Sequence, residues 1–389
     1  MVRSNIDFIY MDMVDCKMDK KIKLMVLFGG VSGEHTISCA TASSVISHIN
    51  TDKYDVIPVG ITKTGKWVKV EQDIASFALS STNVAAEVVD TGLEVTITSS
   101  GTALIIGENN GTTSVLEDLG RIDVALPLLH GPFGEDGTLQ GFFEMCNIKY
   151  VGCGVFSSAV CMDKHYTKMV LAGAGLPISP YTVITDLLWE KDHNLALDQV
   201  ESLGYPVFVK PARAGSSLGI TRVDSKEDLK DAILKAREVD PKVIVEAFVG
   251  GREVESAVLQ GRDGLPRVGQ IGELQMNLPE KGFYDYENKY FEHGNVEIVC
   301  PAVISDCVAD KIKEYAGLAF QALGCEGLAR VDFFYDNRGD KIVINEVNTM
   351  PGFTPYSMYP IIWQKTGMSY GQLVEELIEL ALSRPVGLR

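Results

Sequence analysis

The sequence predicts a mixed α/β and α+β protein whose first region holds a doubly wound parallel sheet. In the first third of the chain, short apolar runs alternate with helical patterns, and this β-α-β order is typical of parallel sheets. In the last third, two strand patterns are joined by a tight turn, which indicates antiparallel pairing. The 389 residues, of which 46% are hydrophobic, are sufficient for two or three domains.

The first region opens on an apolar run at 24–28 that stops at Gly29 and Gly30. This pattern predicts a buried strand that feeds a tight turn. Residues 62–118 combine β-branched stretches with turn residues, and we expect a strand-rich insertion there. The other elements expected in this region are a helix at 36–49, strands at 56–61 and 124–127, and a helix at 138–146.

The pattern changes further along the chain. Helices and strands continue to alternate after Cys153, and from Glu246 onward they follow an α+β order. The turn Asp336-Asn-Arg-Gly-Asp340 predicts a hairpin between the last two strands. The expected helices lie at 163–174, 226–239, 306–323 and 370–383, and the expected strands at 207–210, 219–223, 243–246, 329–335 and 341–347.

Charge and cysteine usage disfavour several classes of protein. The formal net charge of −17 argues against nucleic-acid binding, because a phosphate backbone requires a basic face. None of the eight cysteines forms a C-x-x-C pair, so reduced thiols explain them better than disulfides or a zinc site. No apolar run reaches the ~18 residues that span a bilayer, and residues 1–20 lack the apolar stretch of a signal peptide. We therefore expect a cytoplasmic protein without membrane contact, with residues 1–20 as a disordered extension.

The hairpin near the C-terminus holds the strongest candidate site. Side chains alternate along a strand, so Glu346 and Asn348 share one face, and the turn places Asp332 opposite residues close to Glu346. Two carboxylates and an amide oxygen on a rigid sheet are the hard ligands that Mg²⁺ requires. Arg330 shares the face of Asp332 and offers a cation to developing negative charge. A solvated sheet face is the alternative, but the β-branched and aromatic neighbours of these residues disfavour it.

Two glycine-containing loops give weaker signals. Lys210 stands at a strand end, before a glycine- and serine-rich loop at 215–219. A lysine followed by a row of backbone N–H groups suits phosphate, although a plain hairpin loop explains the pattern equally well. The loop at 29–33 is followed by Glu34, whose carboxylate would repel a phosphate and suits the ammonium group of a ligand.

Two motifs that resemble nucleotide-binding loops fail on their context. Gly29-Gly30-x-x-Gly33 lacks the spacing of a dinucleotide fingerprint, and the next strand ends without the acidic residue that would hold a ribose. Gly60-x-x-x-x-Gly65-Lys66 resembles a P-loop, but Trp67 stands where a hydroxyl should bind Mg²⁺. These failures exclude a dehydrogenase and a P-loop enzyme, and the chain also lacks hydrolase-elbow and zinc-protease motifs.

Six longer motifs follow one another along the chain. They are Gly29-Gly30-x-Ser32-x-Glu34, His130-Gly-x-x-Gly134-Glu135-Asp136-Gly137-Thr138-Leu139-Gln140-Gly141, Met162-Asp163-Lys164, Lys210-Pro-x-Arg-x-Gly215-Ser216-Ser217-x-Gly219, Phe283-Tyr284-Asp285-Tyr286-Glu287-x-Lys289-Tyr290, and Glu346-x-Asn348-Thr349-x-Pro351-Gly352-Phe353-Thr354. In this order, over residues 23–383, they closely resemble the D-alanine–D-alanine ligases of the ATP-grasp superfamily. The resemblance implies three domains at 21–152, 153–245 and 246–389, with ATP between the second and the third.

The resemblance also implies roles for single residues on the nucleotide side. The residues expected to contact ATP phosphates are Lys164, Lys210, Ser216, Ser217 and Lys289. Those expected at the adenine and ribose are Glu246, Ala247, Val249 and Glu253. Asp332, Glu346 and Asn348 would hold two Mg²⁺ ions, for which Mn²⁺ can substitute.

On the substrate side, the resemblance implies that Glu34 binds the ammonium group of the first D-alanine. Ser216 and Tyr290 would join Glu34 in a hydrogen-bonded link that closes the site. Arg330 and the N–H group of Gly352 would stabilise the tetrahedral intermediate. The residues expected to line the substrate site are Glu34, His130, Arg330, Ser357 and Met358, with Ser357 holding the second carboxylate.

This assignment agrees with the chemistry of the residues. Phosphorylation by ATP would turn the carboxylate of the first D-alanine into an acyl phosphate, which the amine of the second then attacks. Phosphoryl transfer depends on positioning and charge neutralisation, which explains why no catalytic serine or cysteine is evident. An acyl phosphate hydrolyses, so water must be excluded, and the aromatic-rich segment 278–293 is the natural lid.

Three alternatives remain open at this point. Relatives use D-lactate or D-serine as the second substrate, whereas Tyr290 and Met358 favour D-alanine here. A different ATP-grasp ligase would lack the lid sequence, Glu34 and Ser357, and a non-catalytic ATP-binding module could lose metal ligands that are intact in this chain. The family further implies a homodimer and a role in the synthesis of peptidoglycan precursors.

Overall fold

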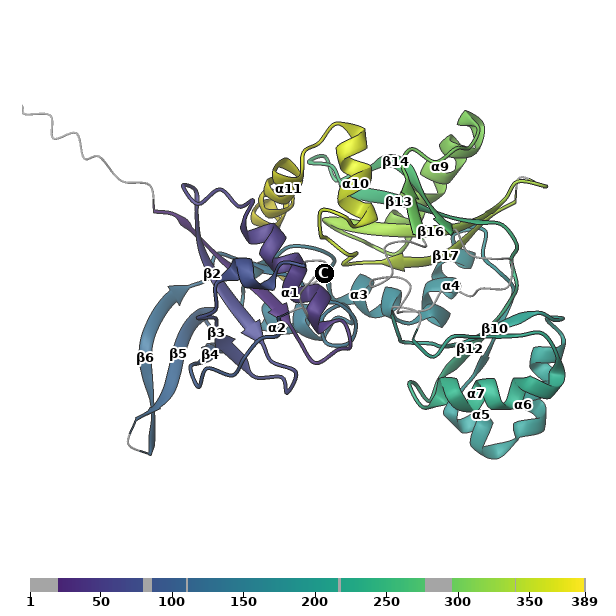
Figure 1. Ribbon diagram of the computed structural model, residues 1–389, viewed down its shortest axis with the longest axis horizontal. Coiled ribbons are helices and arrows are strands. Elements are labelled where there is room, and N and C mark those ends of the chain that lie inside the picture. The colour runs from purple at the N-terminus through teal and green to yellow at the C-terminus, as the bar shows by residue number, and fades with distance from the viewer. Residues whose placement is uncertain are drawn as a thin grey trace, which may run out of the picture.

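The computed structural model describes residues 20–79, 86–109, 111–215, 218–276, 296–339 and 341–387. Three β-sheets organise this part of the chain. Figure 1 shows the first sheet at the left, the central sheet at the lower right and the third sheet at the upper right. The extension predicted at 1–20 lies outside the described residues except for Lys20. Within the described ranges, no helix is both long and apolar enough to cross a membrane.

The first sheet has the strand order β6-β5-β4-β3-β2-β1-β7-β8. Strand β1 pairs in parallel with β2 and β7, and the strands β3 to β6 continue the sheet in antiparallel fashion. Helices α1 and α2 cover opposite faces, so the predicted doubly wound arrangement and the strand-rich insertion are confirmed. The elements are β1 (Ile22–Gly29), α1 (His35–Ile46), β2 (Tyr54–Ile61), β3 (Trp67–Lys69), the 3₁₀ turn η1 (Ile74–Phe77), β4 (Glu94–Ile97), β5 (Thr102–Asn109), β6 (Thr112–Arg121), β7 (Val124–Pro127), α2 (Thr138–Met145) and β8 (Lys149–Tyr150).

The central sheet is antiparallel, with the order β11-β10-β12-β9, and three helices pack on it around one apolar core. The single helix predicted at 226–239 begins with a tighter 3₁₀ turn, a common way for a helix to start. The elements are β9 (Tyr181–Ile184), α5 (Asp186–Lys191), α6 (His193–Glu201), β10 (Val207–Pro211), β11 (Thr221–Val223), η2 (Lys226–Asp228), α7 (Leu229–Arg237) and β12 (Val243–Ala247).

The third sheet is also antiparallel, with the order β15-β14-β13-β16-β17. One face packs on α9 together with α3 and α4, which precede the central sheet in the sequence, and α10 contacts β13 and β14. The elements are α3 (Val155–Met162), α4 (Lys164–Gly173), β13 (Arg252–Gln260), β14 (Pro266–Met276), β15 (Val296–Val299), α9 (Asp306–Ala322), β16 (Leu328–Asp336), β17 (Lys341–Asn348) and α10 (Met358–Thr366).

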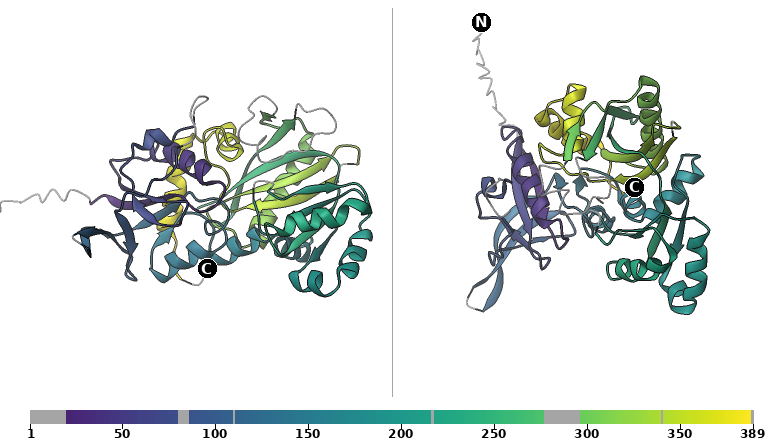
Figure 2. Two further views of the ribbon diagram at one scale, coloured as in Figure 1. Left: turned by 60° about the horizontal axis from the view of Figure 1, so that its bottom comes forward. Right: turned by 45° about the vertical axis from the view of Figure 1, so that its right-hand side comes forward.

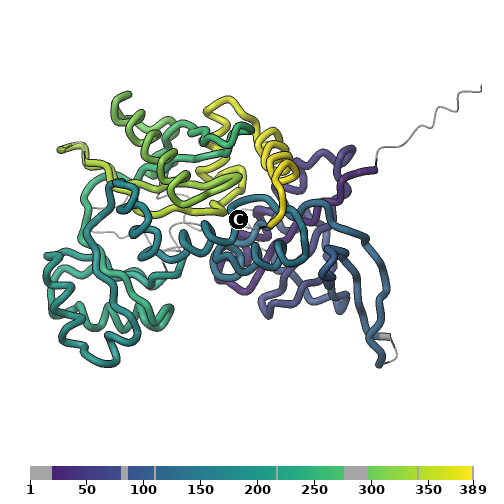
Figure 3. The backbone as a smooth tube through the Cα atoms, turned by 180° about the vertical axis from the view of Figure 1, so that it is seen from behind, coloured from purple at the N-terminus to yellow at the C-terminus, as the bar shows by residue number. Residues whose placement is uncertain are grey.

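The last helix returns to the beginning of the chain. Helix α11 (Tyr370–Ser383) contacts β7 and β8 and shares an apolar core with β1 and α1, as Figure 3 also shows from behind. The domain limits 21–152, 153–245 and 246–389 therefore remain a proposal, because α3, α4 and α11 pack against sheets of other segments. In both views of Figure 2, the central and third sheets lie next to each other. Lys210 of β10 lies 3.4 Å from Asn345 of β17, which places these two strands of the two sheets in contact.

Candidate active site

Three carboxylates form a row across the third sheet. In the strand register, Glu255 of β13 lies opposite Asp332 of β16, and Asp332 lies opposite Glu346 of β17. Directly opposite residues of antiparallel strands share a face, and one step along the sheet Arg330 lies opposite Asn348 on that same face. The strand alternation therefore gathers the predicted metal ligands as the sequence indicated. Glu255, which sequence reasoning missed, extends the row by one strand.

Arg330 is bound by carboxylates on two strands. Its Nε and Nη2 atoms each donate to one oxygen of Asp332 at 2.7 Å, and Nε lies 3.0 Å from Oε2 of Glu255. Burial opposes the charge of the guanidinium, but the two carboxylates more than offset burial and raise the pKa of Arg330. Asn348 donates from Nδ2 to Asp332 at 3.0 Å. Asp332 is thus the centre of this cluster.

The donor set of this face fits a hard divalent cation. Carboxylate oxygens of Glu253, Glu255 and Asp332 all lie within 4.8 Å of one another, and Glu346 and Asn348 continue the group on β17. Like charges directly opposite each other on neighbouring strands are unfavourable without a cation between them. Carboxylate and amide oxygens are the ligands of Mg²⁺, so these residues are suited to hold it.

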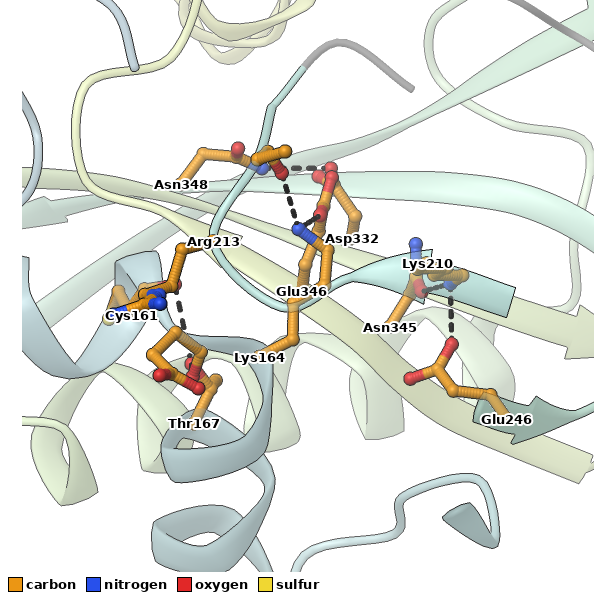
Figure 4. A network of polar contacts seen from close by, with 12 residues as sticks. Cys161, Lys164, Thr167, Lys210, Arg213, Glu246, Asp332, Asn345, Glu346 and Asn348 are labelled. Atoms are coloured by element: carbon orange, nitrogen blue, oxygen red, sulfur yellow. Dashed lines mark hydrogen bonds and ion pairs between the residues drawn. The ribbon is translucent and has the colours of Figure 1, made fainter. Parts of the chain in front are cut away.

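Two lysines approach this row, one from helix α4 and one from β10 of the central sheet, as Figure 4 shows. Lys164, the first residue of α4, donates to the carbonyl of Ala214 at 2.7 Å, and its Nζ lies 3.5 Å from Oε2 of Glu346. Lys210 of β10 contacts the carboxylate of Glu246 and lies 3.4 Å from Oδ1 of Asn345. Of the lysines predicted to contact phosphate, the two in the described residues, Lys164 and Lys210, therefore lie where the two sheets meet.

Glu246 is buried between two lysines. Lys168 of α4 approaches its Oε1 at 2.8 Å and also donates to Ser179 at 2.9 Å, while Lys210 contacts Oε2. Burial opposes the charged carboxylate, but the two lysines lower the pKa of Glu246 to about 2. For the lysines the balance differs, since burial lowers the pKa of Lys168, whereas Glu246 raises that of Lys210.

Sequence reasoning missed Lys168, although a local signal for it exists. Lys168 lies four residues after Lys164 on α4, so both face the same side of the helix. Around Glu246, the other predicted nucleotide residues line the exit of β12 and the start of β13. Ala247 ends β12 and donates its N–H to Pro180 at 2.9 Å, Val249 is half-buried, and Glu253 faces the carboxylate row.

The predicted first-substrate residues lie on the first sheet. Glu34 precedes α1, and a methyl group added to Gly131 or to Gly215 would lie 3.3 Å from its Oε2 atom. The carboxylate therefore lies close to two loop backbones, and a side chain at either glycine would have to displace it slightly. His130 is buried, and its Nδ1 lies 3.0 Å from the carbonyl oxygen of Met350.

The predicted second-substrate residues lie in the segment after β17 and at the first residue of α10. Ser357 immediately precedes α10, and its Oγ accepts from the N–H of Thr354 at 3.1 Å. A methyl group on Gly352 would lie 3.1 Å from this Oγ, so the two residues are neighbours. Met358 is buried against Gly272 of β14. The predictions for Ser216, Ser217, Lys289, Tyr290 and the lid 278–293 fall outside the described residues.

Two antiparallel sheets that meet at lysines on one side and carboxylates on the other define an ATP-grasp enzyme, the fold class that the motifs predicted. In the amino-acid sequence, residues 23–153 match the family model "D-ala D-ala ligase N-terminus", and residues 170–379 match the family model "D-ala D-ala ligase C-terminus". The chain therefore belongs to the D-alanine–D-alanine ligase family.

Individual relatives agree with this membership. A D-alanine–D-alanine ligase of Paenarthrobacter aurescens is 49% identical over 94% of this chain and 97% of its own. Among solved structures, the VanG D-Ala:D-Ser ligase of Enterococcus faecalis superposes with a TM-score of 0.77 at 35% identity, covering 93% of this chain and 100% of that one. The D-alanine-D-alanine ligase of Coxiella burnetii gives a TM-score of 0.74 at 30% identity, with 94% of each chain covered.

Proposed function

We propose that the protein uses ATP to join two molecules of D-alanine into D-alanyl-D-alanine, a step in the synthesis of peptidoglycan precursors. The observation that carries this proposal is the meeting of lysines with carboxylates between two sheets, where Lys164 lies 3.5 Å from Glu346. An anionic triphosphate suits the lysines, and the cations that accompany it suit the carboxylates. Family membership supports D-alanine as the substrate.

In this proposal, the nucleotide is bound through residues of both sheets. Lys164 and Lys210 contact the phosphates, and Asp332, Glu346 and Asn348 hold two Mg²⁺ ions, for which Mn²⁺ substitutes. Bound Mg²⁺ supplies positive charge against the phosphoryl group during its transfer. The nucleotide residues of the adenine and ribose end are Glu246, Ala247, Val249 and Glu253. Because the carboxylate of Glu246 is enclosed by two lysines, we assign it to positioning them.

The same arrangement provides for both halves of the reaction. A carboxylate oxygen of the first D-alanine attacks the γ-phosphorus, which yields D-alanyl phosphate and ADP. The neutral amine of the second D-alanine attacks the acyl carbon, and inorganic phosphate leaves. Glu34 holds the first ammonium group, and Ser357 holds the second carboxylate. Arg330 and the N–H of Gly352 stabilise the oxyanion of the tetrahedral intermediate.

The remaining roles follow from the family resemblance. His130 and Met358 line the substrate site, and Ser216 and Tyr290 link to Glu34. Ser217 and Lys289 contact phosphate. The segment 278–293 closes over the acyl phosphate and keeps water away from it.

Product analysis with four substrate sets tests the proposal. We would measure phosphate release and the product formed from MgATP with D-alanine, with L-alanine, with D-alanine plus D-serine, and with D-alanine plus D-lactate. We expect one phosphate per D-alanyl-D-alanine with D-alanine alone, and no release with L-alanine. No release with any D-substrate would contradict the proposal.

D-Serine is the second candidate for the second substrate. It is favoured by the name of the VanG relative, a D-Ala:D-Ser ligase that is 35% identical. If phosphate were released only when D-serine is present, D-serine rather than D-alanine would be the second substrate, and the proposed mechanism would be unchanged. Family resemblance also supports a homodimer in the cytoplasm, and sedimentation of the full chain would measure the oligomeric state.

A further inference from the structure

The motif His130-Gly-x-x-Gly134-Glu135 has a feature that the proposed reaction does not use. The side chain of Glu135 accepts hydrogen bonds from two backbone N–H groups on two separate segments. Gly131, in its own loop after β7, donates to Oε2 at 2.6 Å. Met350, 215 residues further along the chain, donates to Oε1 at 3.0 Å. The two oxygens of one carboxylate therefore join the first sheet to the segment after β17.

The N–H and the carbonyl of Met350 are both hydrogen-bonded to side chains of this one loop. Glu135 accepts from its N–H, and Nδ1 of His130 lies 3.0 Å from its carbonyl oxygen, which makes that ring nitrogen the donor. The side chain of Met350 is buried in the core shared by β7 and α11. Backbone and side chain together leave Met350 little freedom to shift along the first sheet.

The segments that Glu135 joins carry the two halves of the substrate site. Gly131 lies beside the carboxylate of Glu34, because a methyl group at Gly131 would lie 3.3 Å from Oε2. Met350 precedes Gly352 by two residues, and Gly352 lies beside Ser357. The ammonium site of the first D-alanine and the oxyanion and carboxylate sites of the second are thus set relative to each other through Glu135.

We propose that Glu135 is a positioning residue that holds the second-substrate segment 350–357 in register with Glu34, so that D-alanyl phosphate is captured by the amine rather than by water. This inference rests on the proposed function. Nucleophilic attack requires reacting atoms about 3–3.5 Å apart, and a shift of about 1 Å costs two orders of magnitude. The first half-reaction involves only ATP and the first D-alanine. A displaced segment 350–357 would misplace the second D-alanine and therefore impair the second half-reaction more than the first.

The burial and the charges around Glu135 are those of an enclosed acidic group. Burial and the charge of Glu34 raise the pKa of Glu135 to about 8, and the two N–H donors of Gly131 and Met350 work against this rise. An unpaired carboxylate would be expensive in such surroundings. The two N–H bonds offset only part of this cost, so with a pKa of about 8 the group is largely protonated near neutral pH, and the two hydrogen bonds rather than its charge fix its position.

The variant Glu135→Gln tests this inference, because an amide has one acceptor oxygen and its NH₂ group cannot accept the second N–H. The measured quantity is the ratio of phosphate released to D-alanyl-D-alanine formed. Water attack on D-alanyl phosphate returns D-alanine and phosphate, so misplacement of the second substrate raises this ratio above one. We expect a ratio well above one, a kcat for dipeptide lower by about tenfold to a hundredfold, and a KM for ATP within about twofold of the wild type.

Asp136→Asn is the matched control. Asp136 lies in the same loop and also accepts two N–H groups, from Phe133 at 2.8 Å and Thr138 at 3.0 Å, but both donors belong to its own loop. The control makes the same change from acid to amide and loses the same acceptor oxygen, but both of its donors lie in its own loop and neither belongs to Met350. We expect its ratio to stay at one. A role of Glu135 in local stability alone would lower phosphate and dipeptide together in both variants, and the ratio would not change.

The outcomes separate the two proposals. Wild type that makes no dipeptide from MgATP and D-alanine contradicts the proposed function. Wild type that makes dipeptide at a ratio of one, with Glu135→Gln also at one, overturns the role of Glu135. If Glu135→Gln does not fold, Glu135→Asp replaces it, because its carboxylate is one methylene too short to bridge both donors. The same excess of phosphate is expected, and its absence overturns the inference.

Discussion

The two sheets that meet at the site carry opposite excess charges there. At the central sheet, one carboxylate is enclosed by two lysines, since Lys168 of α4 and Lys210 of β10 both contact Glu246 of β12. On the third sheet, three carboxylates in a row, Glu255, Asp332 and Glu346, share one arginine of that sheet. The first group has one positive charge in excess, and the second has a negative excess.

This difference indicates which part of a nucleotide each side accepts. A buried lysine excess requires an anion, and phosphate supplies one. A carboxylate row requires cations, and Mg²⁺ accompanies the phosphates. A magnesium triphosphate therefore satisfies both sides at once, whereas either half alone would leave charges uncompensated. The following predictions test the two sides separately, starting with the largest expected effect.

The third-sheet side is most sensitive at Asp332. Asp332→Asn removes one charge from the row and one of the two 2.7 Å bonds from Arg330, because the amide keeps a single acceptor oxygen. We expect kcat for dipeptide to fall about a hundredfold to a thousandfold, measured by product formation at saturating ATP and Mg²⁺. Asp336→Asn, at the exposed end of the same strand, is the control and should retain wild-type activity. Retention of more than a tenth of the activity in Asp332→Asn would remove Asp332 from the proposed metal site.

On the lysine side, Lys210 and Lys168 should differ although both contact Glu246. Lys210 lies 3.4 Å from Asn345, toward the third sheet, whereas Lys168 donates to Ser179 behind Glu246. We expect Lys210→Met to lower kcat/KM for ATP about a hundredfold. Lys168→Met should mainly lower stability, by about 3–5 kcal/mol for one half of a broken buried pair. Urea unfolding measures the stability of each variant, and steady-state kinetics corrected for the folded fraction measure its activity. Equal losses of activity would show that the two lysines are equivalent.

The pairing of Glu246 predicts a dependence of stability on pH. Its folded pKa of about 2 lies below the ordinary value of 4.5. A lowered folded pKa means that the stabilisation is present above pH 4.5 and is lost as the pH falls toward 2. The amount is about 3 kcal/mol.

Urea unfolding of the wild type and of Glu246→Gln between pH 6 and pH 2.5 measures this effect. The difference in the free energy of unfolding between the two proteins should narrow as the pH falls, because Glu246 takes up a proton in the unfolded chain before it does in the folded protein. A difference that stays constant over this range would mean that the two lysines do not hold Glu246 ionised.

The sequence predicted more of the carboxylate side than of the lysine side, for a physical reason. Strand alternation and one tight turn place Asp332, Glu346 and Asn348 together, since these residues lie within a single hairpin. The pairing of Lys168 and Lys210 with Glu246 joins a helix to two strands of another sheet. Local patterns do not specify such tertiary contacts.

The same limit explains the other residues that sequence reasoning missed. Glu255 belongs to the row only through the pairing of β13 with β16, which are separated by more than one element in the chain. The contact of Glu135 with Met350 spans 215 residues. Likewise, α11 was predicted as a helix, but its packing against β7 and β8 follows from the tertiary fold alone. Long-range pairing decides these positions, and no local periodicity encodes it.

The central claim is that the lysine and carboxylate sides together direct the γ-phosphoryl group of ATP onto the carboxylate of D-alanine. Incubation of the protein with MgATP and D-alanine labelled with ¹⁸O in both carboxylate oxygens tests this directly, with mass analysis of phosphate, ADP and AMP. The account predicts one ¹⁸O atom in each inorganic phosphate, formation of ADP, and no label in any nucleotide. Unlabelled phosphate, or ¹⁸O in AMP, would contradict it, because the carboxylate oxygen would then not have been bonded to the γ-phosphorus.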